Sequence, residues 1–144
     1  DRTEPINPYG ATKLAFEGAM RWFCAAHDFR GISLRYFNVA GATAMNGEDH
    51  DPETHLVPLV LRVAAGQATH VQIHGQDYST PDGTCIRDFI HVRDLANGHL
   101  LALEASGEAD PSFEVYNLGS AAGFSVRGNQ RSKQVFPAYN RGNT

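Results

Sequence analysis

Apolar positions follow a helical spacing first and a strand spacing next along the opening of the chain. From residue 9 to about residue 28 the apolar side chains fall near one helical face, which predicts a helix that Gly31 ends: Leu14, Met20, Phe23 and Cys24. Pro8 suits the entrance of that helix, because the first helical N–H groups have no intrahelical acceptor. Residues 31–42 then alternate apolar and polar side chains before small residues begin, which predicts a buried strand running into a glycine loop.

The same alternation of helix and strand continues to residue 119. Residues 55–66 predict a helix capped by Thr54, with Pro58 confining its regular part to the residues that follow. Residues 70–75 predict a short strand, 76–88 a loop, 88–105 a helix and 113–119 a further strand. Helices that alternate with strands predict an α/β fold with a parallel sheet. Over 125–144 no period emerges, and Gly128 interrupts the helix that Ser125 is placed to cap, so we expect a divergent, disordered tail from residue 128.

Composition narrows the class of protein. The chain has 144 residues, 42% of them hydrophobic, and a net charge of -4. Nucleic acid is an unexpected partner, because phosphate binding requires a basic face. No run of about 18 apolar residues is present, so we expect no membrane span. The two cysteines, Cys24 and Cys85, have neither a metal-ligand nor a redox spacing, which favours a cytoplasmic location.

Tyr9 and Lys13 are the first candidates for chemistry. They lie four residues apart on the predicted helix and therefore share a face. A nearby ammonium favours the phenolate form of a tyrosine, so the pair can serve as a general base for a hydroxyl proton. Removing that proton is useful when hydride leaves the same carbon, which requires a nicotinamide cofactor. The spacing also occurs by chance, so the sequence around the pair has to support the interpretation.

The surrounding blocks supply that support. "NPYGATK" resembles the Tyr-x-x-x-Lys signature of the extended short-chain dehydrogenases/reductases, and "LRYFNVAGA" follows it in the expected order. With "HLVPLVL", "GQDYSTPDGTCIRDFIHVRDLANGHLLALE" and "YNLGSAAGFSV", the stretch from about residue 5 to residue 127 resembles the UDP-glucose 4-epimerase family, also called UDP-galactose 4-epimerases. This resemblance implies NAD as cofactor, UDP-glucose and UDP-galactose as substrates, and a homodimer.

The resemblance also implies a role for individual residues. Tyr9 takes the proton from the hydroxyl at carbon four of the hexose, and Lys13 holds the nicotinamide ribose. Hydride passes to bound NAD, the keto sugar turns over in its pocket, and the hydride returns to the opposite face. Phe37 contacts the nicotinamide, with core packing as its alternative, and Asn38 contacts the diphosphate or the sugar.

Further residues are matched to the nucleotide. Arg87 corresponds to a pyrophosphate-binding arginine, although an ion pair with Asp88 or Asp82 is the alternative from its neighbourhood. His55 replaces an asparagine that, with the leucine at Leu56, lies near the diphosphate in the family. In this family the uracil is bound by a strand that corresponds to Gln72, Ile73 and His74.

The histidines do not predict a metal site. His50 and His55 are surrounded by acidic residues, but their spacing matches no ligand motif, so we expect a solvated acidic loop and no metal. His91 and His99 lie on a predicted helix and are expected at the surface or in the core.

Several family features are absent from the sequence. The glycine-rich nucleotide-binding turn, the upstream Ser or Thr and a second phosphate-binding arginine have no counterpart, so we expect an inactive fragment without the N-terminal half. The expected fold is the C-terminal part of a Rossmann-like parallel sheet domain over 1–40, followed by most of a small mixed α/β substrate-binding domain over 41–127, with helix 91–105 packing back on the first. Another nucleotide-sugar epimerase or dehydratase, or a non-catalytic nucleotide-sugar-binding remnant, remains an alternative. Three apolar side chains of the first helix serve either a dimer contact or packing on the sheet: Phe16, Met20 and Phe23.

Overall fold

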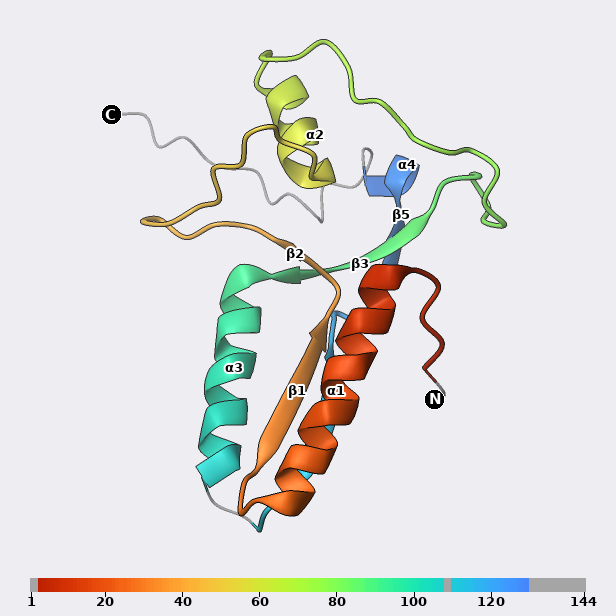
Figure 1. Cartoon of the computed structure of the whole chain (residues 1–144). Coiled ribbons are helices and arrows are strands. Elements are labelled where there is room, and N and C mark those ends of the chain that lie inside the picture. The colour runs from red at the N-terminus through yellow and green to blue at the C-terminus, as the bar shows by residue number, and fades with distance from the viewer. Residues whose placement is uncertain (1–2, 108–109, 130–144) are drawn as a thin grey trace. The chain divides into compact units, whose positions relative to one another are not determined.

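The computed structural model describes residues 3–107 and 110–129, and the described chain forms two compact units (Figure 1). The first unit contains the residues up to Tyr36 together with Arg93–Leu118, and the second contains Phe37–Val92 and the residues from Gly119 onward. The expected assignment of 1–40 to the cofactor and 41–127 to the substrate stays a prediction. Among the described helices, none has both the length and the apolar character that a membrane crossing requires.

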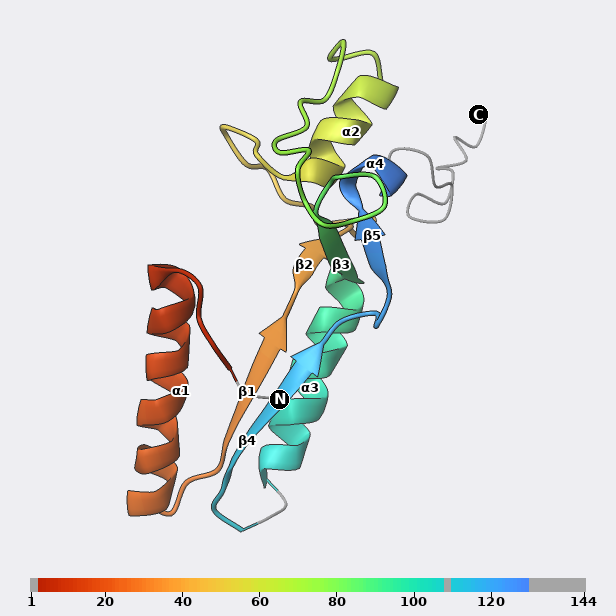
Figure 2. The same ribbon diagram turned by 90° about the vertical axis from the view of Figure 1, so that its right-hand side faces the viewer.

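The first unit is a pair of parallel strands between two helices. Strand β1 (Gly31–Tyr36) pairs with β4 (Phe113–Leu118) in parallel, in register from Gly31 opposite Phe113 to Tyr36 opposite Leu118. Helices α1 (Pro8–Ala26) and α3 (Val92–Gly107) lie on opposite faces of this pair (Figures 1 and 2). The α/β fold with a parallel sheet is therefore confirmed, and two strands joined in parallel require a crossover of this kind.

Helix α1 begins and packs as its sequence dictates. The Asn7 side chain accepts a hydrogen bond from the Gly10 N–H at 2.8 Å, and Pro8 occupies the first helical position. At the other end Gly31 lies so close to the helix that an added Cβ would come within 3.0 Å of the Cys24 sulfur. A glycine fits this close approach, because a Cβ would force the Cys24 and Met20 side chains to shift.

The second unit contains a three-stranded mixed sheet. β2 (Asn38–Ala40) pairs in parallel with β3 (Ile86–His91), and β3 pairs antiparallel with β5 (Gly123–Ser125) (Figure 2). Helix α2 (Leu56–Ala64) and the short α4 (Val126–Asn129) complete the unit. Strands β3 and β5 were not predicted. The loop expected over 76–88 is confirmed up to residue 85 and the helix expected over 88–105 from residue 92, but residues 86–91 form β3 instead. Phe89 and Ile90 are held by pairing with β2, which no local pattern shows.

Three further expectations about local structure are wrong. Helix α2 begins at Leu56, before Pro58, since a proline in the first turn gives up no intrahelical hydrogen bond, and its N-cap is His55 instead of Thr54. Residues 70–75 form no strand among the described pairings. The Ser125 hydroxyl accepts the Gly128 N–H at 3.0 Å, so Gly128 belongs to a helical turn, and the tail expected from residue 128 lies outside the described residues beyond 129.

The core of the described chain is small. Cys24 and Ile90 are the buried apolar residues, and Glu17 and Thr84 are the buried polar ones among the residues that the structure describes. Large apolar side chains remain exposed on α1 and α3, among them Phe16, Trp22, Phe23, Leu100 and Leu103. Phe16 and Phe23 are thus available for a contact with another surface, whereas Met20 is half-buried and reaches Gly31 of the sheet.

Candidate functional site

Helix α1 presents Tyr9 and Lys13 on one face, as their spacing predicts. The Lys13 Nζ lies 5.1 Å from the centroid of the Tyr9 ring, within the range of a cation–π contact. Tyr9 is 71% exposed, so its ring and hydroxyl are open to a ligand. The Thr12 hydroxyl donates to the Tyr9 carbonyl at 2.8 Å within the same helical turn. The structure therefore brings together an accessible phenol and an ammonium.

An ion pair fixes the helix that carries this pair of residues. Arg35 Nε on β1 donates to Glu17 Oε1 on α1 at 2.7 Å, Arg35 Nη2 donates to the other carboxylate oxygen, and the Ser33 hydroxyl donates at 3.2 Å. The hydrogen bonds from Arg35 lower the pKa of the Glu17 carboxyl below its ordinary value. Only 10% of the Glu17 side chain is exposed, so this ion pair connects α1 to β1 beneath the surface.

A shallow pocket lies beside Lys13. Its volume is about 220 Å³, and Glu17 and Arg35 contribute to its lining together with the chain before α1, including Thr3, Glu4 and Pro5. Sequence reasoning missed Glu17 and Arg35, because they are 18 residues apart and no motif links them. The half-buried ion pair contributes polar groups to a lining that is otherwise mainly apolar.

Phe37 and Asn38 follow directly after β1 and belong to the second unit. Phe37 is exposed, and its ring lies against the backbone of Gly119, where an added Cβ would meet it at 2.7 Å. The Asn38 side-chain amide donates to the Asp88 carbonyl at 3.1 Å and so ties β2 to β3. Since Phe37 is exposed, the core-packing alternative for it is wrong. Among the residues that the structure describes, the Asn38 side-chain oxygen accepts no hydrogen bond.

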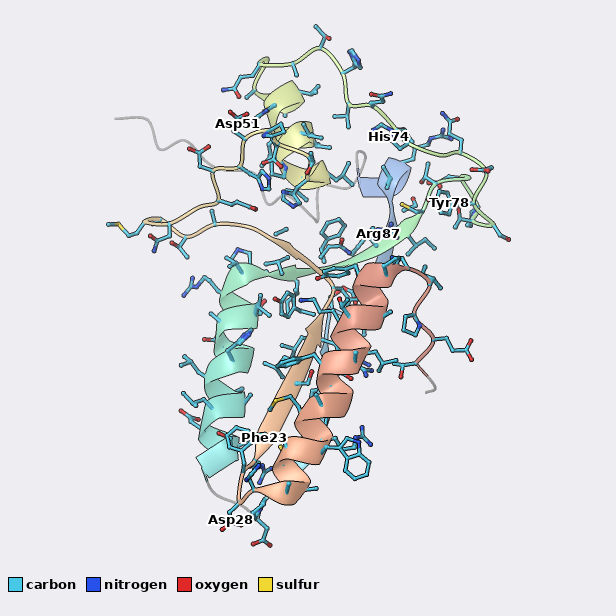
Figure 3. All side chains as sticks on the ribbon, viewed as in Figure 1. Phe23, Asp28, Asp51, His74, Tyr78 and Arg87 are labelled. Atoms are coloured by element: carbon cyan, nitrogen blue, oxygen red, sulfur yellow. The ribbon has the colours of Figure 1, made fainter. Side chains whose placement is uncertain are left out.

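Arg87 is exposed on β3 (Figure 3), and among the residues that the structure describes its guanidinium donates to the Ile86 carbonyl alone, at 3.2 Å. Within the described ranges it forms no ion pair, so the pairing with Asp88 or Asp82 is wrong. Asp88 accepts hydrogen bonds from Ser120 N and Oγ at 2.9 and 2.7 Å, which lower its pKa. Because the Asp88 carboxylate is bonded to Ser120, it does not bind Arg87, and most N–H donors of the Arg87 guanidinium are open to an anion.

Asp82 holds the loop before β3 in place, a role that sequence reasoning did not predict. Its carboxylate accepts the Ser125 hydroxyl at 2.5 Å and the Thr84 N–H and hydroxyl at 2.9 and 2.7 Å. These bonds lower its pKa to about 2. Arg127 Nη1 adds a bond to the Asp82 carbonyl at 3.2 Å. The loop before β3 is thereby anchored to β5 and α4.

Gln72, Ile73 and His74 lie in the irregular segment that connects α2 to β3; His74 is marked in Figure 3. Gln72 and His74 are exposed and Ile73 is half-buried. These residues belong to none of the described sheets, so the strand expected over 70–75 is wrong.

His55 lies at the N-cap of α2 and Leu56 opens the helix. The imidazole is not a cap: its Nδ1 and the His55 N–H both contact Glu53 Oε1, at 2.9 and 2.7 Å. The backbone bond from His55 is the main cause that lowers the pKa of Glu53. Glu48 and His50 approach the same imidazole, an arrangement that the separation in sequence did not predict.

The amino-acid sequence of this chain is similar to those of several UDP-glucose 4-epimerases. A UDP-glucose 4-epimerase of Lacticaseibacillus casei is 52% identical over 127 residues, which are 87% of this chain and 38% of that protein. One from Halalkalibacterium halodurans is 53% identical over 129 residues, 88% of this chain and 38% of that protein. The chain thus spans about two fifths of the length of these relatives. The resemblance inferred from the sequence is confirmed.

Solved structures agree with the sequence comparison. The UDP-glucose 4-epimerase of Brucella ovis in complex with NAD superposes with a TM-score of 0.78 at 48% identity, covering 89% of this chain and 40% of that one. The Bifidobacterium longum enzyme in complex with NAD+ and UDP gives a TM-score of 0.78 at 40% identity, covering 89% and 39%. Residues 1–119 match the NAD dependent epimerase/dehydratase family. Since this match runs through most of the sequence, the chain belongs to the NAD-dependent epimerase/dehydratase family.

Proposed function

We propose that this chain is part of a UDP-glucose 4-epimerase, which interconverts UDP-galactose and UDP-glucose in galactose metabolism. The contact of Lys13 Nζ with an exposed Tyr9 ring, 5.1 Å from its centroid, is the observation that carries the proposal. The relatives at about half identity support the choice of this activity within the family.

The residues of the first unit fit the nicotinamide end of NAD. Lys13 offers three N–H donors to ribose hydroxyls, and the exposed Tyr9 ring is suited to a flat nicotinamide. In the second unit, the exposed Phe37 ring is the residue that we assign to a nicotinamide contact. When bound, NAD supplies the acceptor and donor of hydride. Lys13 would hold and orient the nicotinamide ribose. Tyr9 takes a proton from a sugar hydroxyl at its phenolic oxygen and later returns it. The Glu17–Arg35 ion pair holds α1, the helix that carries Tyr9 and Lys13, against β1.

The second unit supplies the proposed contacts with the nucleotide sugar. Arg87 is the anchor for the diphosphate, because its guanidinium is exposed and forms no ion pair within the described chain. We assign Asn38, His55 and Leu56 to the diphosphate and sugar, and Gln72, Ile73 and His74 to the uracil. The segment around His74 would recognise the base through backbone groups that no sheet partner occupies.

We further propose a homodimer in the cytoplasm. The exposed Phe16 and Phe23 of α1 are the residues that support an apolar contact between copies. Sedimentation of the complete protein tests this state, and a monomer at all concentrations would contradict it.

The test of the activity uses the complete protein that carries this sequence. UDP-galactose is supplied without added reductant, and UDP-glucose is detected by a coupled dehydrogenase. Tyr9→Phe should lower turnover about 10²–10⁴-fold, the usual contribution of a general base, while UDP binding is kept. Tyr116→Phe, which removes a hydroxyl from β4 in the same unit, is the matched control and should turn over normally.

Other outcomes separate the alternatives. Full turnover by Tyr9→Phe would remove Tyr9 from the proposed role. Loss of water from a dTDP-sugar without conversion of UDP-galactose would indicate a dehydratase. Nucleotide-sugar binding by the complete protein with no reaction would indicate a binding remnant.

A further inference from the structure

Three side chains of the loop before α2 converge in the second unit. Glu48, His50 and His55 each bring one potential ligand atom to within 4.8 Å of the others. Glu48 Oε1 lies 3.4 Å from His50 Nδ1 and 3.9 Å from His55 Nδ1, and the two imidazole rings meet at a centroid distance of 5.2 Å. The Glu48 carboxylate oxygen therefore lies near both imidazoles.

These separations match those of a bound cation. Zinc binds histidine nitrogen and carboxylate oxygen at about 2.0–2.2 Å, so two ligand atoms of a tetrahedral site lie about 3.4 Å apart. The separation of Glu48 Oε1 and His50 Nδ1, 3.4 Å, is at that spacing, and one imidazole nitrogen of His55 lies within 4.8 Å of both ligand atoms. Closing the set requires rotation of the exposed Glu48 and His50 side chains toward the His55 ring, which Glu53 holds. Two imidazoles and one carboxylate also form a donor set that zinc uses in proteins.

Glu53 provides the supporting contact. Only 4% of its side chain is exposed, and its Oε1 lies 2.9 Å from His55 Nδ1. A carboxylate that holds one nitrogen of a histidine fixes the ring and leaves the other nitrogen for a metal, which is the usual outer contact of zinc-binding histidines. The buried Glu53 thus orients an exposed His55.

We propose that Glu48, His50 and His55 bind a divalent cation of the zinc type, with Glu53 as the positioning residue behind His55. Glu48, Asp49, Asp51 and Glu53 give this loop a concentration of negative charge that favours a cation. The three ligands are exposed, so a water molecule or an oxygen of a ligand can complete the coordination. The mixed nitrogen and oxygen donors favour Zn²⁺ over Mg²⁺, which prefers oxygen ligands alone. His55 is also one of the residues assigned to the diphosphate and sugar above, so the test of this inference measures metal binding alone and does not depend on epimerase activity.

Titration of the whole chain with Zn²⁺ alone tests the site. The experiment is done in a Cys85→Ser background, which removes the half-buried thiol as a competing ligand. Competition with a chromophoric chelator should show one saturable equivalent of Zn²⁺ and none of Mg²⁺. Co²⁺ in place of Zn²⁺ should give the intense visible absorption of a tetrahedral site.

The variants separate this site from other histidines. His50→Ala and Glu48→Gln should each weaken Zn²⁺ binding at least about 10-fold, and Glu53→Gln should weaken it by about 10–100-fold through His55. His70→Ala, which changes another exposed histidine of the same unit, is the control and should bind as the parent does. Circular dichroism checks the fold, and if His50→Ala unfolds, Glu48→Gln decides, since it alters a single exposed atom. No saturable equivalent, or equal affinity in Glu48→Gln and the parent, overturns the proposal.

Discussion

The Glu17–Arg35 pair offers a direct test of how α1 is held. In Glu17→Gln the side chain keeps its shape, but its NH₂ group is brought against a guanidinium that has only donors. Removing one partner of a fully buried pair costs about 3–5 kcal/mol, and an exposed pair contributes about 0–1 kcal/mol. Glu17 has 10% of its side chain exposed and Arg35 34%, so Arg35 can recover some hydration. We therefore expect a loss of about 2 kcal/mol, between the two limits.

Urea unfolding followed by circular dichroism measures this loss. With an m-value of about 2 kcal/mol/M, the midpoint of the variant should fall by about 1 M. Combining Glu17→Gln with Arg35→Gln should recover part of the cost, since the two residues interact directly. Glu104→Gln, at an exposed position on α3, is the control and should stay within about 0.5 kcal/mol of the parent.

The pH dependence of the same difference has a defined sign. The folded-state pKa of Glu17 is lowered from its ordinary 4.5 because Arg35 binds the carboxylate. A lowered pKa means that the unfolded chain binds the proton more tightly, so the contribution is complete above 4.5 and is lost as pH falls through the native pKa. The gap between parent and Glu17→Gln should therefore narrow on acidification below 4.5. A gap under about 0.5 kcal/mol at neutral pH, or one that does not change in acid, would refute the reasoning.

Two further predictions concern the loop before β3. Gly83→Ala should destabilise the chain by more than about 2 kcal/mol, because Gly83 has φ +74° and a Cβ would meet the Gln76 carbonyl oxygen closely. Gly66→Ala has the same backbone strain at φ +73° with open space, so thermal unfolding should show only about 1–2 kcal/mol there, and equal losses would contradict the clash. Asp82→Asn should increase amide hydrogen exchange over residues 76–84 at neutral pH. Since the pKa of Asp82 is lowered from 3.8 to about 2, the parent should lose the same protection as pH falls through that range, and protection unchanged by the substitution would argue against the anchor.

Some features of this protein were determined by the sequence alone. The start of α1, the Tyr9–Lys13 face and β1 rest on contacts within a few residues, so capping, helical spacing and alternation are enough to predict them. The family followed from blocks of residues in a fixed order, which the comparison with relatives confirmed.

Tertiary structure decided what depends on partners distant along the chain. β3 was mistaken for a loop and the start of a helix, because only pairing with β2, about 50 residues earlier, holds Phe89 and Ile90 extended. Glu17 met Arg35, and Asp82 met Ser125, across separations of 18 and 43 residues that no period connects. Glu48, His50 and His55 come within 4.8 Å of one another only through the conformation of the loop before α2. Local spacing fixes which face a side chain occupies, whereas the closure of the chain fixes which other side chain it meets.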